Sequence, residues 1–199
     1  MAQPAPSDKN DEPLGPAFLR EYARTRGFML GRPVRPKPTP DGKAVLFLRS
    51  GPTDPRQSLF EFDVATGRTR ELLTPQQVLK GAEEKLSPEE KARRERMRVT
   101  AGGFANYQLS EDGSLVLLSL SGKLYVLDRK TEKVRELKTG PGTILDPKFS
   151  PDGKMVGYVK DHDVYAYDLA TDEEWAVTTG GTPERTHGLA EFVAQEEMG

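Results

Sequence analysis

The chain has 199 residues, of which 35% are hydrophobic and 30% charged, yet its formal net charge is only −2. This balance excludes the strongly basic surface of a protein that binds nucleic acid or anionic membranes. The absence of cysteine excludes disulfides and thiolate metal sites. The 19 glycines and 16 prolines suit a turn-rich, all-β chain.

Residues 1–17 are rich in proline and contain no apolar run, which predicts a disordered N-terminal tail. A signal peptide would need a basic start and an apolar stretch, so we expect a cytoplasmic protein, or a periplasmic or secreted one whose leader has been removed. No stretch reaches the ~20 apolar residues of a membrane span, and the chain is expected to be soluble. Residues 18–37 follow as a short helix and lead-in, expected to pack near the first strands.

Three copies of one pattern come next. Each copy has an Asp-Gly turn, an apolar strand, an aromatic strand that ends on Asp, and a Thr three residues later. The turns are Asp41-Gly42, Asp112-Gly113 and Asp152-Gly153, and the later pairs are Asp63 with Thr66, Asp128 with Thr131, and Asp168 with Thr171. A period of about forty residues with four strand candidates is typical of a propeller blade.

The repeat predicts an all-β fold in which residues 38–199 form part of a β-propeller, with four-stranded blades at 38–74, 104–140 and 144–180. An antiparallel sandwich also has short strands separated by turns. It does not explain why the same Asp-x-x-Thr signature recurs after every third strand. Three blades cannot close a ring, so the isolated chain is expected to be marginally stable.

The first break in the repeat is an insertion at residues 75–103. Within it, Ser87 as N-cap, Pro88 at the first position and Glu90 at the third predict the start of a helix. The following residues are rich in arginine and nearly devoid of apolar side chains. They fit a solvated surface helix held by Glu–Arg pairs, or a projection that presents guanidinium groups to a carbonyl or carboxylate.

The second break is the segment 186–199, where a short helical segment carries Glu196 and Glu197 in place of a fourth Asp-Gly turn. Taken alone, two adjacent acids are an ordinary solvated pair. The two histidines of the chain are assigned structural positions: His162 in a surface turn and His187 before the acidic pair. A metal site at residues 161–163 is disfavoured, because three adjacent residues cannot converge on one ion without distant ligands.

Two stretches resemble the dipeptidyl peptidase IV branch of the prolyl oligopeptidase superfamily: Glu89–Arg98 and, above all, Glu191–Met198 with its Phe-Val-x-Gln-Glu-Glu motif. The resemblance runs from about Phe18 to the end of the chain. It implies an eight-bladed propeller above a C-terminal α/β-hydrolase domain with a Ser-His-Asp triad. Such enzymes remove dipeptides from the N-termini of peptides.

By this resemblance, Glu196 and Glu197 bind the free α-amino group of the substrate. Arg94 and Arg96 occupy the stretch from which an arginine contacts a substrate carbonyl in some members, and the helix register decides which one faces inward. The implied partners are a peptide with a free N-terminus and the hydrolase domain, and a homodimer is compatible with the family. Neither a cofactor nor a metal is expected.

The chain departs from the family in lacking a Gly-x-Ser-x-Gly nucleophile motif and the hydrolase half. We therefore expect an N-terminal propeller fragment of a serine dipeptidyl peptidase, inactive by itself and contributing substrate recognition. The alternative is a stand-alone propeller module that binds proteins or peptides without chemistry. The coding sequence beyond residue 199 distinguishes them, because the enzyme requires further blades and a nucleophile.

Overall fold

The computed structural model describes residues 15–80 and 102–189. These residues form three antiparallel sheets, each built from four strands in chain order. Blade 1 contains β1 (Val34–Pro38), β2 (Ala44–Ser50), β3 (Gln57–Asp63) and β4 (Thr69–Leu73). Blade 2 contains β5 (Tyr107–Leu109), β6 (Leu115–Leu120), β7 (Lys123–Asp128) and β8 (Val134–Glu136). Blade 3 contains β9 (Ile144–Phe149), β10 (Met155–Lys160), β11 (Asp163–Asp168) and β12 (Glu174–Ala176). The helices are α1 (Pro16–Arg24) and α2 (Pro75–Leu79).

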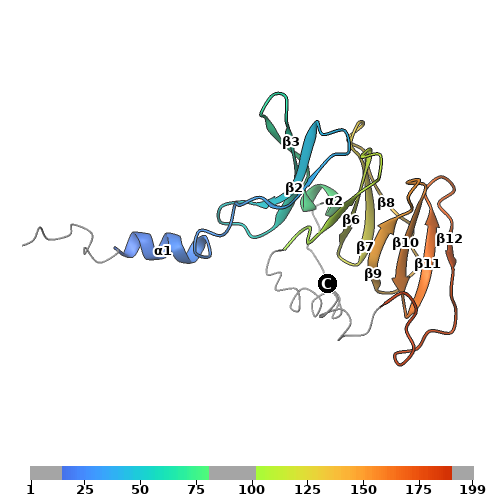
Figure 1. The fold of residues 1–199 in the computed structure, drawn as a ribbon. Coiled ribbons are helices and arrows are strands. Elements are labelled where there is room, and N and C mark those ends of the chain that lie inside the picture. Colours follow the sequence, from blue (N-terminus) through green and yellow to red (C-terminus); the bar gives the residue numbers. More distant parts are fainter. Residues whose placement is uncertain (1–14, 81–101, 190–199) are drawn as a thin grey trace, which may run out of the picture.

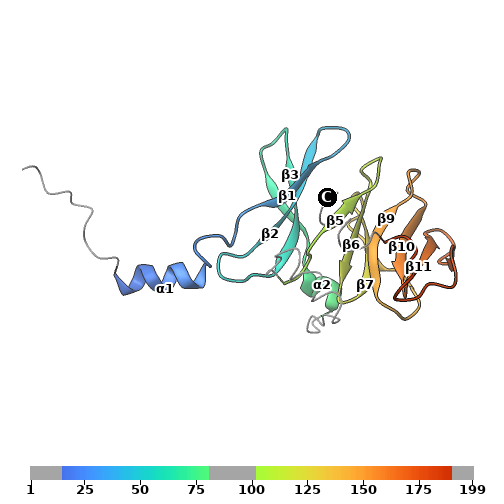
Figure 2. The same ribbon diagram turned by 60° about the horizontal axis from the view of Figure 1, so that its bottom comes forward.

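The three blades stack side by side, with blade 2 in the middle (Figures 1 and 2). Strand β6 is apolar at every position except Ser119, because its two faces enter two cores: Val116 and Leu118 belong to the core shared with blade 1, and Leu117 to the core shared with blade 3. Both faces of this sheet are covered by a neighbouring sheet. The predicted blades are therefore confirmed, and the sandwich alternative is wrong because two packed sheets would leave the outer faces to solvent.

The repeated Asp-x-x-Thr signature is a hydrogen-bonded turn between the third and fourth strands of each blade. In every copy the Thr amide donates to the Asp carboxylate, at 2.7 Å in blade 1, 2.8 Å in blade 2 and 3.0 Å in blade 3. The Asp-Gly turns have a matching device, in which a Ser or Thr hydroxyl donates to the Asp at 2.6–2.7 Å. The signature recurs because short polar side chains satisfy the turn backbone in the same way each time.

Two boundaries and one helix differ from the sequence-based expectation. Strand β1 begins at Val34 instead of residue 38, and α1 begins at Pro16, inside the expected tail. Helix α2 was not predicted, although Thr74 and Gln77 form a reciprocal capping box at its start. The helix expected from Ser87 lies outside the described residues.

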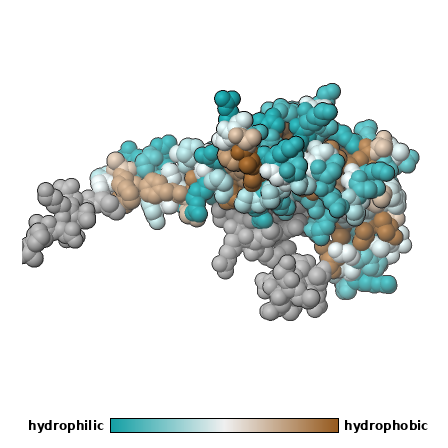
Figure 3. All heavy atoms as spheres, turned by 45° about the horizontal axis from the view of Figure 1, so that its top comes forward, coloured by the Kyte–Doolittle hydropathy of each residue, from teal (hydrophilic) through white to brown (hydrophobic). Residues whose placement is uncertain are grey.

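Helix α1 projects away from blade 1 instead of packing on it (Figures 1 and 2). Phe18, Tyr22 and Phe28 pack on one another, with centroid distances of 5.7–6.1 Å, and all three remain exposed. Figure 3 shows apolar surface along this projecting part of the chain. The loop after α1 joins blade 1 through Gly31, whose amide donates to Ser50 Oγ at 3.0 Å. Neither described helix is long and apolar enough to cross a membrane.

Tyr107 links the first two blades. Its hydroxyl lies 2.8 Å from the Arg35 carbonyl and 2.7 Å from the Leu46 carbonyl of blade 1, and it donates to these oxygens. Burial raises the pKa of Tyr107 well above its ordinary value. Tyr107→Phe is expected to lower the free energy of unfolding by about 1–2 kcal/mol, because a buried carbonyl loses its donor. Urea denaturation would measure this, with the exposed Tyr22→Phe as the control; equal midpoints for the two variants would contradict the assignment.

Candidate functional site

The repeated turns lie at one end of the stacked blades, and the breaks in the repeat start from the other end. Consecutive connections in an antiparallel sheet alternate between its ends. The Asp-Gly and Asp-x-x-Thr turns therefore lie at one end of each blade, which we call the turn end. The connection between the second and third strands, and the exit from the fourth strand, lie at the opposite end, the insertion end. Both breaks in the repeat follow a fourth strand, so both start from the insertion end.

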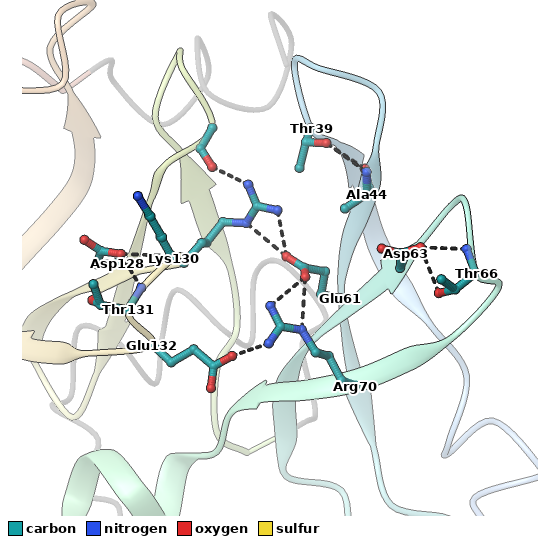
Figure 4. A network of polar contacts seen from close by, with 12 residues as sticks. Thr39, Ala44, Glu61, Asp63, Thr66, Arg70, Asp128, Lys130, Thr131 and Glu132 are labelled. Atoms are coloured by element: carbon teal, nitrogen blue, oxygen red, sulfur yellow. Dashed lines mark hydrogen bonds and ion pairs between the residues drawn. The ribbon is translucent and has the colours of Figure 1, made fainter.

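Ion pairs at the turn end show that the blades are stacked in the same orientation. Arg70 of blade 1 pairs with Glu132 of blade 2 (Figure 4). The same two positions in the next blades, Arg135 and Asp172, also pair. Because each pair joins the start of a fourth strand to the residue after the Asp-x-x-Thr turn of the next blade, the turn ends are aligned, and the insertion ends must be aligned too.

The first insertion returns to the sheet at Gln57, the first residue of β3. The Gln57 amide donates to the Gly102 carbonyl at 2.9 Å, and the Phe104 amide donates to the Gln57 carbonyl at 3.1 Å. Gly103 between them has a φ of +73°, and a Cβ there would lie 2.6 Å from the Gln57 carbonyl oxygen. Glycine is required at this position because no side chain fits against the strand.

The segment after β12 is held at the same end of blade 3, where Asp163 is the first residue of β11. The Asp163 carboxylate accepts hydrogen bonds from Thr178 Oγ1 at 2.8 Å, the Gly181 amide at 3.0 Å and His187 Nδ1 at 2.8 Å. We call these four residues the Asp163 cluster. The bond from His187, followed by those from Gly181 and Thr178, holds the pKa of Asp163 below its usual value. The carboxylate is mostly buried, with 14% of its side chain exposed.

A second buried pair stiffens blade 3 next to this cluster. Lys160 Nζ lies 2.7 Å from Glu174 Oε1, and its side chain is only 5% exposed. The Tyr158 hydroxyl also donates to Glu174, as does the Gly140 amide at 3.0 Å. Burial alone would raise the pKa of Glu174. The hydrogen bonds together lower it by more than burial raises it, so the net pKa lies below the usual value. Glu174 therefore stays ionised beside Lys160.

The four expected site residues, Glu196, Glu197, Arg94 and Arg96, all lie outside the described residues, and their roles remain predictions. The structure describes the ends of the chain that lead to them. These ends are held at Gln57 and Asp163, the first residues of the third strands of blades 1 and 3. The end returning from the arginine stretch and the segment leading to the glutamate pair are thus attached at the same end of the stacked blades.

The sequence interpretation missed the Asp163 cluster. Its members lie up to 24 residues apart, and Asp163 was considered only as a weak metal ligand beside His162. In the described part of the chain there is no group of three His, Asp or Glu residues that could hold a metal. His187 binds Asp163 through its side chain and the His162 carbonyl through its amide at 2.8 Å, which fits the structural position expected for it.

The stacked four-stranded blades define the class of the protein as a β-propeller, and comparison with one solved structure supports this fold. The chain aligns with Porphyromonas gingivalis dipeptidyl peptidase 4 with a TM-score of 0.52 and 22% identity, covering 86% of this chain and 22% of that one. It also aligns with TolB from Acinetobacter baumannii with a TM-score of 0.47 and 20% identity, covering 76% of this chain and 33% of that one. The alignment with the tricorn protease has a TM-score of 0.49 and 15% identity and covers 74% of this chain and 13% of that one. This chain therefore spans a third or less of each of these chains.

A family comparison is more specific. Residues 110–199 match the family described as the dipeptidyl peptidase IV (DPP IV) N-terminal region. The matched stretch contains most of blade 2, all of blade 3 and the segment with Glu196 and Glu197. Over these residues the chain is similar to that N-terminal region, and the resemblance noted in the sequence is confirmed there.

Proposed function

We propose that this chain is the N-terminal propeller part of a serine-type dipeptidyl peptidase and that it recognises the N-terminus of the peptide substrate. The observation that carries the proposal is the family match over residues 110–199, which includes the Phe-Val-x-Gln-Glu-Glu motif. The 199 residues contain no nucleophile motif, so hydrolysis requires a further α/β-hydrolase domain in the full-length protein.

In this proposal Glu196 and Glu197 bind the α-amino group of the substrate. Two carboxylates around one ammonium make short, charge-assisted hydrogen bonds, which are about twice as strong as neutral ones. The same pair leaves no room for residues before the substrate N-terminus. It therefore makes the enzyme an exopeptidase that releases dipeptides.

Arg94 or Arg96 is proposed to contact a backbone carbonyl of the same substrate. A guanidinium group presents several N–H donors in a planar fork and stays charged at any physiological pH. The attachments at Gln57 and Asp163 support this pairing of roles, because the described residues that flank both segments are attached at the insertion end of the blades.

The proposal predicts that cleavage requires a free α-amino group on the substrate, and this requirement can be tested. The full-length protein is expected to cleave a dipeptidyl p-nitroanilide and to cleave its N-acetylated form at least about 100-fold more slowly in kcat/KM, because acetylation removes the ammonium charge. The isolated 199-residue chain is the control and should hydrolyse neither compound. Equal rates on the free and acetylated substrates would overturn the proposal.

A further inference from the structure

We propose that Asp163 is a positioning residue for substrate recognition: through Thr178, Gly181 and His187 it holds the segment that leads into the glutamate pair. The inference rests on the proposed function of Glu196 and Glu197. It adds a residue that lies 33 positions away from that pair and belongs to the sheet itself. Asp163 acts through this segment and does not itself contact the substrate.

The first support is that one carboxylate gathers three points of the segment. Thr178 Oγ1 and His187 Nδ1 both donate to Oδ1 of Asp163, while the Gly181 amide donates to Oδ2. Residues 178–187 are thereby closed into a loop. Within it, Thr182 and Arg185 form a turn through reciprocal backbone bonds of 2.9 and 3.0 Å. A loop with three bonds to one anchor and an internal turn has few conformations left.

Close packing against blade 3 is the second support. A Cβ at Gly181 would lie 2.4 Å from the His162 carbonyl oxygen. At the other end of the loop, Gly188 has a φ of +74°, and a Cβ there would lie 2.6 Å from Val164 Cγ2. Both glycines allow the backbone to approach β10 and β11 more closely than any other residue could. The loop thus rests directly on the sheet.

Comparison of the blades supports a specific role for the aspartate. The equivalent first residue of β7 in blade 2 is Lys123, which forms a surface pair with Glu136 at 2.6 Å. Blade 3 has a carboxylate at this place, and its oxygens face inward to the loop with 14% of the side chain exposed. An acceptor of two side-chain donors and one amide suits an anchor better than a solvated surface group.

The anchored loop lies close to the glutamate pair along the chain. Glu196 follows His187 by nine positions, a length of chain that spans at most about 30 Å even when fully extended. Releasing His187 and Gly181 would remove two attachments between Thr178 and the pair and increase the conformational entropy lost when substrate binds. Asp163 therefore contributes to substrate affinity by reducing that loss.

The test compares variants of the full-length protein. Asp163→Asn and His187→Leu are expected to raise KM for the free-amine dipeptidyl p-nitroanilide about tenfold, the size of one lost charge-assisted bond, and to change kcat less than about twofold. His187→Asn keeps a side-chain N–H donor and should recover most of the wild-type KM. Lys123→Asn, at the same position in blade 2, is the matched control. Hydrogen exchange at the Gly181 and His187 amides should accelerate in Asp163→Asn.

The possible failures are distinct. Unchanged KM values in both Asp163→Asn and His187→Leu would overturn the inference, even if hydrogen exchange shows that the loop has opened. If Glu196→Gln and Glu197→Gln also leave KM unchanged, the proposed function falls as well. A raised KM in the glutamate variants beside a normal KM in the cluster variants overturns the inference alone. Should Asp163→Asn fail to fold, His187→Leu and its conservative partner His187→Asn still decide the outcome.

Discussion

Replacing Glu196 and Glu197 with glutamine in the full-length protein is expected to lower kcat/KM by about 10²–10⁴-fold. Each carboxylate is proposed to make a charge-assisted bond to the substrate ammonium, and a bond to a charged group contributes about 1.5–3 kcal/mol. Glutamine keeps the size of the side chain but removes the charge that matches the ammonium. Steady-state kinetics on the free-amine dipeptidyl p-nitroanilide would measure the loss.

Glu184→Gln provides a matched control for this experiment. Glu184 is an exposed acid in the loop that precedes the pair. Its replacement changes the net charge by half as much as the replacement of both Glu196 and Glu197. Glu184→Gln should alter kcat/KM by less than about twofold, since a single exposed charge in water contributes little to binding. A normal rate in the double variant, with a melting temperature like that of the wild type, would show that the pair does not bind the substrate.

Glu61→Ala is expected to destabilise the described blades by about 3 kcal/mol, the cost of breaking a buried ion pair by removing one partner. Glu61 lies between blades 1 and 2, with 10% of its side chain exposed, and accepts two bonds from each of two arginines (Figure 4). Arg129 of blade 2 lies 2.7 Å away and is itself largely buried, so it would be left without its carboxylate. A calorimetric melting temperature about 6–12 °C lower would be the readout.

The control for Glu61 is Glu136→Ala. Glu136 pairs with Lys123 at a similar distance of 2.6 Å, but about half of each side chain is exposed. Removal of an exposed pair changes stability by at most about 1 kcal/mol. If both variants lower the melting temperature equally, burial is not the cause of the Glu61 effect.

The Glu61 contribution also has a defined pH dependence. Burial alone would raise the pKa of Glu61. The bonds from Arg129 and Arg70 together lower it by more than burial raises it, so the net pKa lies below the ordinary value. The stabilisation is therefore fully present above the unfolded-state pKa of about 4.3 and is lost as pH falls through the lower folded-state pKa. The difference in melting temperature between wild type and Glu61→Ala should accordingly shrink below about pH 4.

The blade repeat was predictable because its signals are local. Asp128 and Thr131 bond within one turn, and Asp112 bonds to Ser110 two residues before it. Such contacts depend on spacing along the chain, which a sequence displays directly. The cap of α2 at Thr74 was equally local and could have been found.

Long-range contacts could not be predicted in the same way. Glu61 meets Arg129 across 68 positions, and Asp163 meets His187 across 24. Nothing in the residue types at these positions marks them as partners, because acids and bases occur throughout a chain in which 30% of residues are charged. The projection of α1 away from blade 1 was likewise not predictable from the apolar face of the helix, which the sequence predicted to pack near the first strands.

The amino-acid sequence by itself determined the three blades and the glutamate motif, since both are written in short stretches with fixed spacing. The tertiary structure decided that the blades are stacked in one orientation and that the two segments leading to the expected site are attached at one end. The physical reason is that these attachments join positions far apart in the chain: Gln57 meets Gly102 and Phe104, and Asp163 meets Gly181 and His187, only once the strands between them have folded into blades.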